Sequence, residues 1–281
     1  MLIAQITDLH LGFAPGDPAE LNQRRLDAVL DILIDGPNRP DLLLATGDLT
    51  EYGDIDSYRR LAQAFARCPF PVWPCLGNHD DRANFRVVFP AVPMADGFVQ
   101  YEVALEGVRL LLLDTLEEGR HGGAFCETRA AWLTARLEEQ RDVPTLVILH
   151  HPPVEVGIEW MNTDPCEPWV ARLGRALADA PQVRGLLCGH VHRPIAAAWR
   201  GLTVTICPST APQVALDLSP IVIADPDGRP MIVAQPPAFA LHRWTAQGLV
   251  SHFENADAAP VLARYDSAMQ PLIRGMLHER P

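Results

Sequence analysis

The sequence predicts an α/β protein whose sheets are mixed, and three observations lead to this expectation. Short apolar runs, which are typical of strands, alternate along the chain with patterns of helical period. Two neighbouring runs, residues 99–105 and 108–113, are close enough to form a hairpin, so the sheets cannot be purely parallel. From about Pro208 onward, turn signals and short β-like runs dominate, which predicts a β-rich last part of the chain.

The expected strands are apolar runs bounded by polar or turn-forming residues. The runs that we interpret as strands are residues 2–7, 42–46, 72–76, 108–113, 145–149, 185–188 and 203–207. Helices are expected where apolar residues recur every three or four positions. The clearest such pattern covers residues 20–34, and similar patterns cover residues 54–65, 131–137 and 168–177.

The last part of the chain is predicted to be a smaller extension. Two short runs, residues 221–224 and 231–234, flank the turn signal Asp-Pro-Asp-Gly, and a helical tail is expected after Ala259. We therefore predict a core over residues 1–210 and a β-rich and helical C-terminal extension, packed on the core, over residues 211–281. The apolar side chains of residues 236–281 would form a cap or a subunit contact, which leaves a homo-oligomer open.

The composition narrows the classes of partner. With 281 residues, of which 48% are hydrophobic and 21% charged, the chain resembles a globular protein that buries a sizeable core. The net charge of −12, without a basic cluster, argues against a surface for duplex nucleic acid. An anionic substrate would therefore need cations from another source, and metal ions are the simplest one.

The cysteines and the N-terminal stretch indicate the compartment. The six cysteines form no C-x-x-C pair, and several lie in apolar runs, so we expect free thiols. The apolar N-terminal stretch is short for a signal peptide and lacks a basic start, and no run approaches the roughly 18 apolar residues of a membrane span. These features predict a cytoplasmic protein without membrane contact.

Polar side chains follow five of the expected strands at the point where each strand ends. The five clusters are Asp8-Leu-His10, Gly47-Asp48, Gly77-Asn78-His79-Asp80, His150-His151-Pro152-Pro153 and Gly189-His190-Val191-His192. Each cluster alone is explained as a turn, a helix cap or a loop. In open α/β sheets, however, ligands bind at the carboxyl ends of the strands, so the repetition favours one shared site.

The residue types in these clusters suit a metal centre. Imidazole nitrogens and carboxylate oxygens bind divalent metals such as zinc, manganese, cobalt and iron. Seven ligands, drawn from the Asp, Asn and His residues of these five clusters, suffice for two ions. Two ions about 3.5 to 4 Å apart can hold a hydroxide and can bind both the attacking and the leaving oxygen of an in-line displacement. If the backbone is extended through residues 189–192, His190 and His192 point the same way, and we interpret them as one ligand for each ion.

Together the motifs Asp8-x-His10, Gly47-Asp48, Gly77-Asn78-His79-Asp80, His150 and Gly189-His190-x-His192 resemble the calcineurin-like metallophosphoesterase family. The resemblance covers residues 1–210 and is greatest to the bacterial class III cyclic-nucleotide phosphodiesterase and glycerophosphodiesterase group. It implies a four-layer αββα sandwich with two mixed sheets. It also implies two ions of iron, manganese, zinc or cobalt. The implied ligands are Asp8, His10 and His192 for the first ion and Asn78, His150 and His190 for the second, with Asp48 bridging.

The same resemblance implies a metal-dependent phosphodiesterase for small diesters, namely cyclic nucleotides such as cAMP, glycerophosphodiesters or organophosphate diesters. A metal-bound hydroxide would attack phosphorus and an alcohol would leave. Asp48, Asn78 and His79 are the expected catalytic residues, with His79 either donating a proton to the leaving group or serving only as a loop histidine. A phosphomonoesterase of the same fold is the main alternative, ahead of a nuclease or a non-catalytic metal-binding scaffold.

Loops near the expected site supply candidates for substrate contact. Trp160, in the loop of residues 157–162, could stack on a base or could be a buried aromatic residue that holds the loop. Asn22 and His121, the latter within residues 119–123, are weaker candidates. For these residues we predict a position near the pocket and no particular role.

Overall fold

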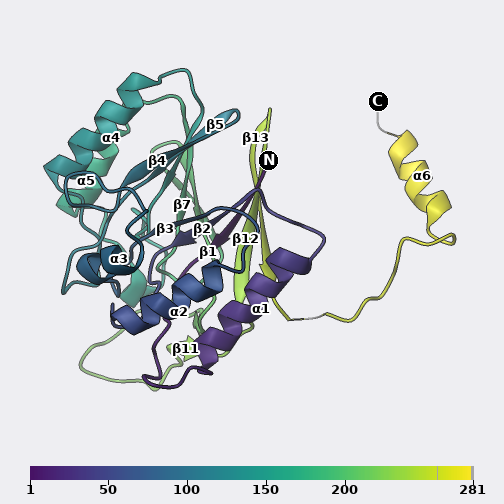
Figure 1. The fold of residues 1–281 in the computed structure, drawn as a ribbon, viewed down its shortest axis with the longest axis horizontal. Coiled ribbons are helices and arrows are strands. Elements are labelled where there is room, and N and C mark those ends of the chain that lie inside the picture. Colours follow the sequence, from purple (N-terminus) through teal and green to yellow (C-terminus); the bar gives the residue numbers. More distant parts are fainter. Residues whose placement is uncertain (258, 280–281) are drawn as a thin grey trace.

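The computed structural model describes residues 1–257 and 259–279, most of which form two large mixed sheets and the helices that cover them (Figure 1). The first sheet has the strand order β13-β12-β1-β2-β3. Its strands are β1 (Leu2–Ile6), β2 (Leu42–Thr46), β3 (Val72–Cys75), β12 (Ala238–Thr245) and β13 (Gly248–Asn255). Strands β1, β2 and β3 are parallel, whereas β12 runs antiparallel to both β1 and β13.

The second sheet has the order β4-β5-β6-β7-β9-β8. Its strands are β4 (Tyr101–Leu105), β5 (Val108–Leu112), β6 (Thr145–Ile148), β7 (Val183–Cys188), β8 (Ile195–Trp199) and β9 (Leu202–Ile206). The central four strands are parallel, and the edge strands β4 and β8 are antiparallel to their neighbours. The predicted hairpin is thus confirmed as β4 and β5, while β8 has no counterpart among the predicted strands.

Helices cover the outer face of each sheet and complete four layers. The helices are α1 (Leu21–Asp35), α2 (Ile55–Phe65) and α3 (Arg82–Val88) on the first sheet, and α4 (Glu127–Glu139) and α5 (Pro168–Ala176) on the second. Successive side chains of β5 point to opposite faces of the second sheet, so they pack in different layers. Leu110 and Leu112 belong to the core shared with the first sheet, and Leu111 packs in the core beneath α4 and α5. The predicted αββα arrangement is therefore confirmed.

Part of the segment after residue 210 belongs to the first sheet, and the rest lies outside both large sheets. Strand β12 pairs with β1 over four residues of register, and its Phe239 and Leu241 join the main core, so a boundary at residue 210 passes through a hydrogen-bonded sheet. A small antiparallel pair, β10 (Gln213–Val214) and β11 (Ile232–Val233), precedes it. The strand predicted at residues 221–224 is wrong, because this stretch has no strand and begins a turn.

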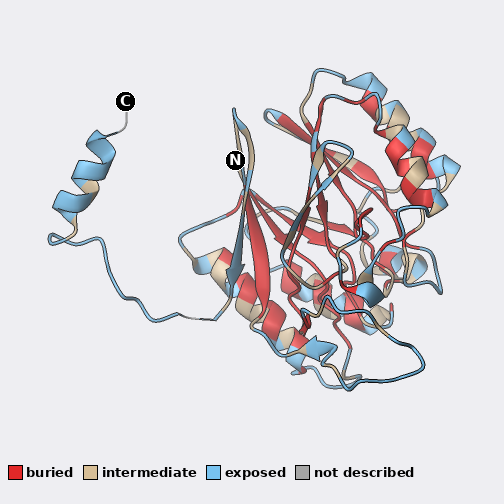
Figure 2. Ribbon diagram, turned by 180° about the vertical axis from the view of Figure 1, so that it is seen from behind, coloured by how far each residue is buried: buried red, intermediate tan, exposed pale blue. Residues whose placement is uncertain are grey.

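The helical tail predicted after Ala259 is present as α6 (Gln270–His278). Figures 1 and 2 show it apart from the sheets, and none of its described side chains is buried. All six cysteines are free, as the sequence predicted, and Cys75, Cys188 and Cys207 are buried. In the described part of the chain, no helix combines the length and the apolar character that crossing a membrane requires.

Candidate metal and catalytic site

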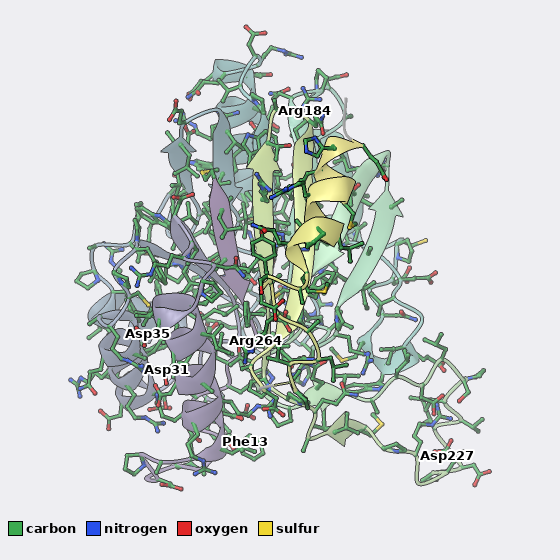
Figure 3. All side chains as sticks on the ribbon, turned by 90° about the vertical axis from the view of Figure 1, so that its right-hand side faces the viewer. Phe13, Asp31, Asp35, Arg184, Asp227 and Arg264 are labelled. Atoms are coloured by element: carbon green, nitrogen blue, oxygen red, sulfur yellow. The ribbon has the colours of Figure 1, made fainter. Side chains whose placement is uncertain are left out.

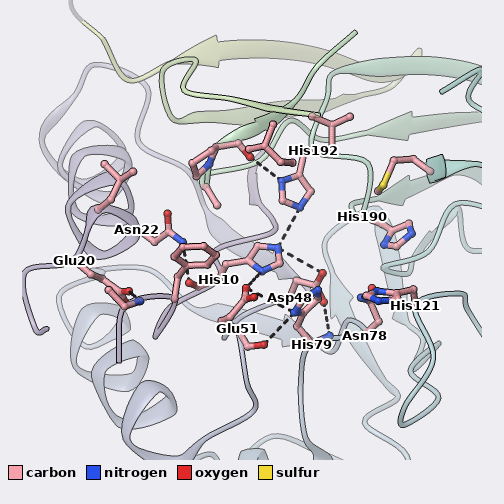
Figure 4. Close-up of a pocket in the computed structure, with 18 of the residues that line it drawn as sticks. His10, Glu20, Asn22, Asp48, Glu51, Asn78, His79, His121, His190 and His192 are labelled. Carbon is pink, nitrogen blue, oxygen red and sulfur yellow. Dashed lines mark hydrogen bonds and ion pairs between the residues drawn. The ribbon is translucent and has the colours of Figure 1, made fainter. Parts of the chain in front are cut away.

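The loops that follow β1, β2, β3, β6 and β7 line one cavity of about 610 Å³ (Figure 4). The seven predicted metal ligands lie together at its bottom, and we call them the floor. Five of them, His10, Asp48, Asn78, His190 and His192, line the cavity directly, whereas Asp8 and His150 lie just beneath and are fully buried. A short 3₁₀ helix, η1 (Glu159–Met161), adds Trp160 and Met161 to the wall.

One half of the floor contains Asp8, His10 and His192, whose ligand atoms lie within 4.8 Å of one another. The Nε2 atoms of His10 and His192 are 3.1 Å apart, and His192 Nε2 is 3.4 Å from Asp8 Oδ1. Two imidazole nitrogens at this separation need a hydrogen or a cation between them, because two lone pairs repel each other. Asp8 Oδ1 is buried and has no hydrogen-bond partner.

The other half contains His150 and His190, whose ligand atoms lie within 4.8 Å of one another, and we assign Asn78, which lines the same cavity, to it. Two buried ligand atoms there, His150 Nε2 and Asn78 Oδ1, have no hydrogen-bond partner. Asp48 lies between the halves, with Oδ2 3.4 Å from His150 Nε2 and 3.7 Å from His10 Nε2. Its Oδ1 accepts the backbone N–H of His79 at 2.9 Å. Unpaired buried polar atoms are costly unless something binds them, so this donor set fits divalent cations.

Three of the floor histidines are oriented in the same way. Each donates its Nδ1–H to an oxygen: His10 to Glu51 Oε2 at 2.6 Å, His150 to Thr46 O at 2.8 Å, and His192 to Pro212 O at 2.9 Å. The Nε2 lone pair of each ring is therefore free to point into the site. Such oxygen partners fix the tautomer and the ring plane of metal-binding histidines.

The backbone of the floor is unusual. Five of its seven residues have positive φ without being glycine: Asp8 at 51°, His10 at 48°, Asp48 at 47°, His190 at 74° and His192 at 57°. The expectation of an extended backbone through residues 189–192 is wrong, because His190 and His192 both adopt the left-handed conformation. Each such residue costs on the order of 1–3 kcal/mol, a strain that concentrates at functional sites.

The turned backbone sends the two rings to different halves of the floor. The His192 ligand atom groups with those of Asp8 and His10, and that of His190 groups with those of His150 and His151. Close packing leaves no room for a larger residue before them, since a Cβ on Gly189 would lie 2.0 Å from Thr7 Oγ1.

The charges of the floor are strongly perturbed. Burial, together with the neighbouring charge of Asp48, raises the pKa of Asp8 to about 6. Burial alone would also raise the pKa of Asp48, but the charges of His150 and His10 hold it well below its usual range. For His150, burial works against the charged form, yet Asp48 and Asp8 raise its pKa to about 9. Perturbed groups of this kind cluster at functional sites.

His79 lies over the floor and stays accessible. Its Nδ1–H donates to Glu51 O at 3.0 Å, its ring meets that of His10 edge to face at 4.6 Å, and its side chain is 26% exposed. Burial would lower its pKa, but the charge of Asp48 and the bond to Glu51 O raise it above the usual value. The ring nitrogen Nε2 is thus free to hold a proton that it can donate.

Two neighbours of the floor serve as supports. His151 uses both ring nitrogens, with Nδ1 2.8 Å from Thr115 Oγ1 and Nε2 3.0 Å from His121 O, so it supports the loop after β6. Asp80 accepts the backbone N–H groups of Gly77 at 2.9 Å and Leu49 at 3.1 Å and so joins the loops after β3 and β2. It does not cap α3, which is capped by Asp81.

Beneath the floor, a buried relay connects three strand ends. Gln5 Nε2 donates to Thr46 Oγ1 at 2.8 Å and to Cys188 O at 3.0 Å, so the ends of β1, β2 and β7 are joined by one amide. Because a carbonyl oxygen only accepts, the Gln5 Oε1 atom must face His242, whose Nε2–H donates to it at 2.9 Å. His242 Nδ1 then accepts from Ser251 Oγ at 2.8 Å.

Sequence reasoning missed Glu51, Gln5 and His242. Glu51 follows Gly47-Asp48 by three residues and offered a weak signal as an acidic residue beside a predicted ligand loop. Gln5 and His242 gave no signal, because their importance depends on the pairing of β12 with β1. The candidates Asn22, His121 and Trp160 do line the cavity, as predicted. Trp160 is 40% exposed, so it is not the buried aromatic residue of the alternative interpretation.

Comparisons with known proteins agree with this geometry. The chain is 31% identical to the probable glycerophosphodiester phosphodiesterase GpdQ of Arcobacter nitrofigilis, over 90% of this chain and 92% of that protein. It is 37% identical to a probable cyclic nucleotide phosphodiesterase of Rhodopseudomonas palustris, over 72% of this chain and 73% of the relative. The fold resembles that of a dimetal phosphatase from Danio rerio with a TM-score of 0.65 at 16% identity, covering 92% of this chain and 96% of that one.

The resemblance inferred from the motifs is therefore confirmed. The family described as calcineurin-like phosphoesterase matches residues 1–194, which include every floor residue, and this chain belongs to that family.

Proposed function

We propose that the protein is a metal-dependent phosphodiesterase that hydrolyses small phosphodiesters. The observation that carries the proposal is the convergence of histidine Nε2 atoms and buried carboxylates, several without a partner, at the bottom of a cavity. The names of the relatives support it, since one is called a glycerophosphodiester phosphodiesterase and the other a cyclic nucleotide phosphodiesterase.

The floor would hold two divalent ions of iron, manganese, zinc or cobalt. Asp8, His10 and His192 would bind the first, and Asn78, His150 and His190 the second. Asp48 would bridge them, because its Oδ2 faces His10 and His150. When bound, such ions lower the pKa of water and neutralise charge on phosphoryl oxygens.

The chain's own residues then position the diester and move protons. His79 would give the proton at Nε2 to the leaving oxygen, since its Nδ1–H is engaged with Glu51 O and its side chain reaches the cavity. Asn78 and Asp48 would act by fixing the reacting groups over the floor. Glu51 would keep His10 in the required tautomer through the 2.6 Å contact to Nδ1.

The charge of the cavity favours diesters over monoesters. All 23 basic residues of the sequence other than histidine are arginines, and among the described residues no arginine lines the cavity. Besides Asp48 of the floor, two further carboxylates, Glu20 and Glu51, do line it. A monoester near neutral pH carries up to two negative charges, which cations outside a metal pair would have to balance, whereas a diester carries one.

The test compares bis(p-nitrophenyl) phosphate with p-nitrophenyl phosphate, before and after metal removal with a chelator. We expect hydrolysis of the diester to be preferred in kcat/KM, to vanish on chelation and to return on adding manganese or zinc. A strong preference for the monoester would contradict the diesterase, and full turnover of the chelated protein would contradict the metal mechanism.

Three further proposals concern the surroundings of the enzyme. The free state of all six cysteines supports a reducing compartment such as the cytoplasm. The acidic net charge of −12 supports a small-molecule substrate over duplex nucleic acid. A C-terminal extension over residues 211–281, including the exposed helix α6, is where we would look for a subunit contact in a homo-oligomer.

A further inference from the structure

The mouth of the cavity is apolar although its floor is polar. Four hydrophobic side chains line the cavity and remain exposed to solvent: Phe13 at 63%, Leu21 at 49%, Trp160 at 40% and Ile232 at 52%. We call these four residues the apolar rim. Single exposed apolar residues are common and need no explanation, but a group of them beside a polar site marks a surface that contacts an apolar ligand.

The position of Phe13 is fixed by its neighbours. Glu20, which is only 2% exposed, accepts the backbone N–H of Gly12 at 2.5 Å and that of Ala14 at 2.8 Å, so one buried carboxylate holds the residues on both sides of Phe13. Arg60 balances that carboxylate at 3.2 Å. Gly12 has φ 90° and lies so near α2 that a Cβ would be 2.2 Å from Ser57 Oγ. The loop is therefore docked, and Phe13 is the side chain that it presents at the margin of the fold beside α1 (Figure 3).

The loop that carries Trp160 is held by its neighbours in a comparable way. It lies in η1, after a strand of the second sheet, whereas Phe13 follows a strand of the first. Asn162 Oδ1 accepts the backbone N–H groups of Val156 at 2.7 Å and Gly157 at 2.9 Å and closes the loop around η1. The Glu159 carboxylate accepts the N–H of Ile221 and joins η1 to the segment before β11.

The polar groups near the start of α1 are already engaged. Glu20 binds two backbone N–H groups, as described above, and Asn22 donates its amide to His10 O at 2.9 Å (Figure 4). The two Glu20 oxygens and the Asn22 amide nitrogen are therefore not free to bind the hydroxyl groups of a polyol ester such as glyceryl. Two aromatic rings on braced loops instead offer flat, apolar contact at a low cost in conformational entropy.

We infer that the apolar rim binds the ester group of the diester and selects a flat, apolar group, either an aryl ring or a nucleobase, over a small or polyol group. This inference rests on the proposed phosphodiesterase function. Phe13 and Trp160 are the specificity-determining residues, and Glu20 is a positioning residue that acts through the loop of Phe13.

The test uses two diesters with the same leaving group. Phenyl p-nitrophenyl phosphate and methyl p-nitrophenyl phosphate both release p-nitrophenolate, so they differ only in the ester group that stays on phosphorus. The metal-loaded native enzyme should favour the phenyl ester in kcat/KM by about tenfold or more, in line with the stacking of one ring on an aromatic side chain.

Phe13→Ala and Trp160→Ala should each lower kcat/KM for the phenyl ester by about tenfold and leave the methyl ester within about twofold. Glu20→Gln should shift the preference in the same direction as Phe13→Ala. Tyr265→Ala is the matched control, because Tyr265 is 72% exposed, lies outside the cavity and should change neither rate. Turnover of the methyl ester also shows whether each variant is folded and has bound its metal ions.

The outcomes separate the inference from the function on which it rests. Hydrolysis of both esters at equal kcat/KM, or parallel losses for both esters in the rim variants, would overturn the rim inference and leave the phosphodiesterase intact. A native enzyme that hydrolyses neither diester with any metal would overturn the proposed function. A second pair, 3′,5′-cyclic AMP and glycerophosphoethanolamine, should repeat the pattern, with Phe13→Ala losing more rate on the nucleotide.

Discussion

The floor and the apolar rim belong to one cavity but are built in different ways. The floor residues are largely buried, three of their histidine rings are fixed by oxygen partners, and five of the seven have a left-handed backbone. The rim residues are half exposed, and Phe13 and Trp160 lie on loops braced by Glu20 and Asn162. In the proposed enzyme, rigid strand ends would therefore carry the chemistry, while the loops anchored on them would select the substrate.

The largest effect is expected at Asp48, where the two halves of the floor meet. Asp48→Ala removes the oxygen that faces both His10 and His150, so both metals should be lost and hydrolysis abolished. The fold should remain, since the core layers do not depend on this side chain. Metal content by mass spectrometry and turnover of bis(p-nitrophenyl) phosphate check this. Asp56→Ala, which removes an exposed carboxylate on α2, is the control, and retained turnover in Asp48→Ala would exclude the bridging role.

The next effect is expected at His79, which lines the cavity and contacts the ring of His10. His79→Ala should keep both metals but slow the reaction by about 10²-fold for diesters with alkoxide leaving groups, because a general acid is lost. The loss should be small for p-nitrophenolate, which leaves without protonation. Comparing kcat across leaving groups of rising pKa measures the difference. If the variant loses a metal ion, His79 is a ligand and belongs to the floor.

Sequence reasoning found the floor because its rule is local: polar residues that follow parallel strands meet at one edge of a sheet. It could not find the backbone conformation of His190 and His192, because positive φ in residues other than glycine is imposed by tertiary contacts. The rim was equally hidden. Phe13 looks like any loop residue until Glu20, seven positions later, is seen to hold both of its neighbours.

The C-terminal strands show the same limit at the level of the fold. The sequence predicted β structure after Pro208 but not that β12 would pair with β1, since the register of a strand more than 200 residues away leaves no local pattern. That pairing is what brings His242 to Gln5 and so places strand β12 beneath the floor.

The smallest predicted effect is on the free energy of unfolding. It concerns His242, which belongs to the buried relay beneath the floor and not to the apolar rim. Burial, with a smaller contribution from the charge of His252, lowers the pKa of His242 to about 3. An unfolded histidine titrates near 6.5, so as the pH falls below that value the unfolded chain binds a proton at this position, whereas folded His242 does not. The free energy of unfolding therefore decreases until about pH 3. Between pH 7 and pH 5 this amounts to about 2 kcal/mol of unfolding free energy.

His242→Gln should therefore weaken the pH dependence of unfolding rather than the chemistry of the floor. In urea titrations with a chelator present, so that metal release does not contribute, the native protein should lose about 2 kcal/mol more than the variant between pH 7 and pH 5. The exposed His278→Gln should behave like the native protein, and so should Phe13→Ala, because the rim does not touch this relay. Equal pH slopes for His242→Gln and the native protein would mean that His242 accepts a proton in the folded state. The relay through Gln5 would then have to bind in a different arrangement, since a doubly protonated ring cannot accept from Ser251.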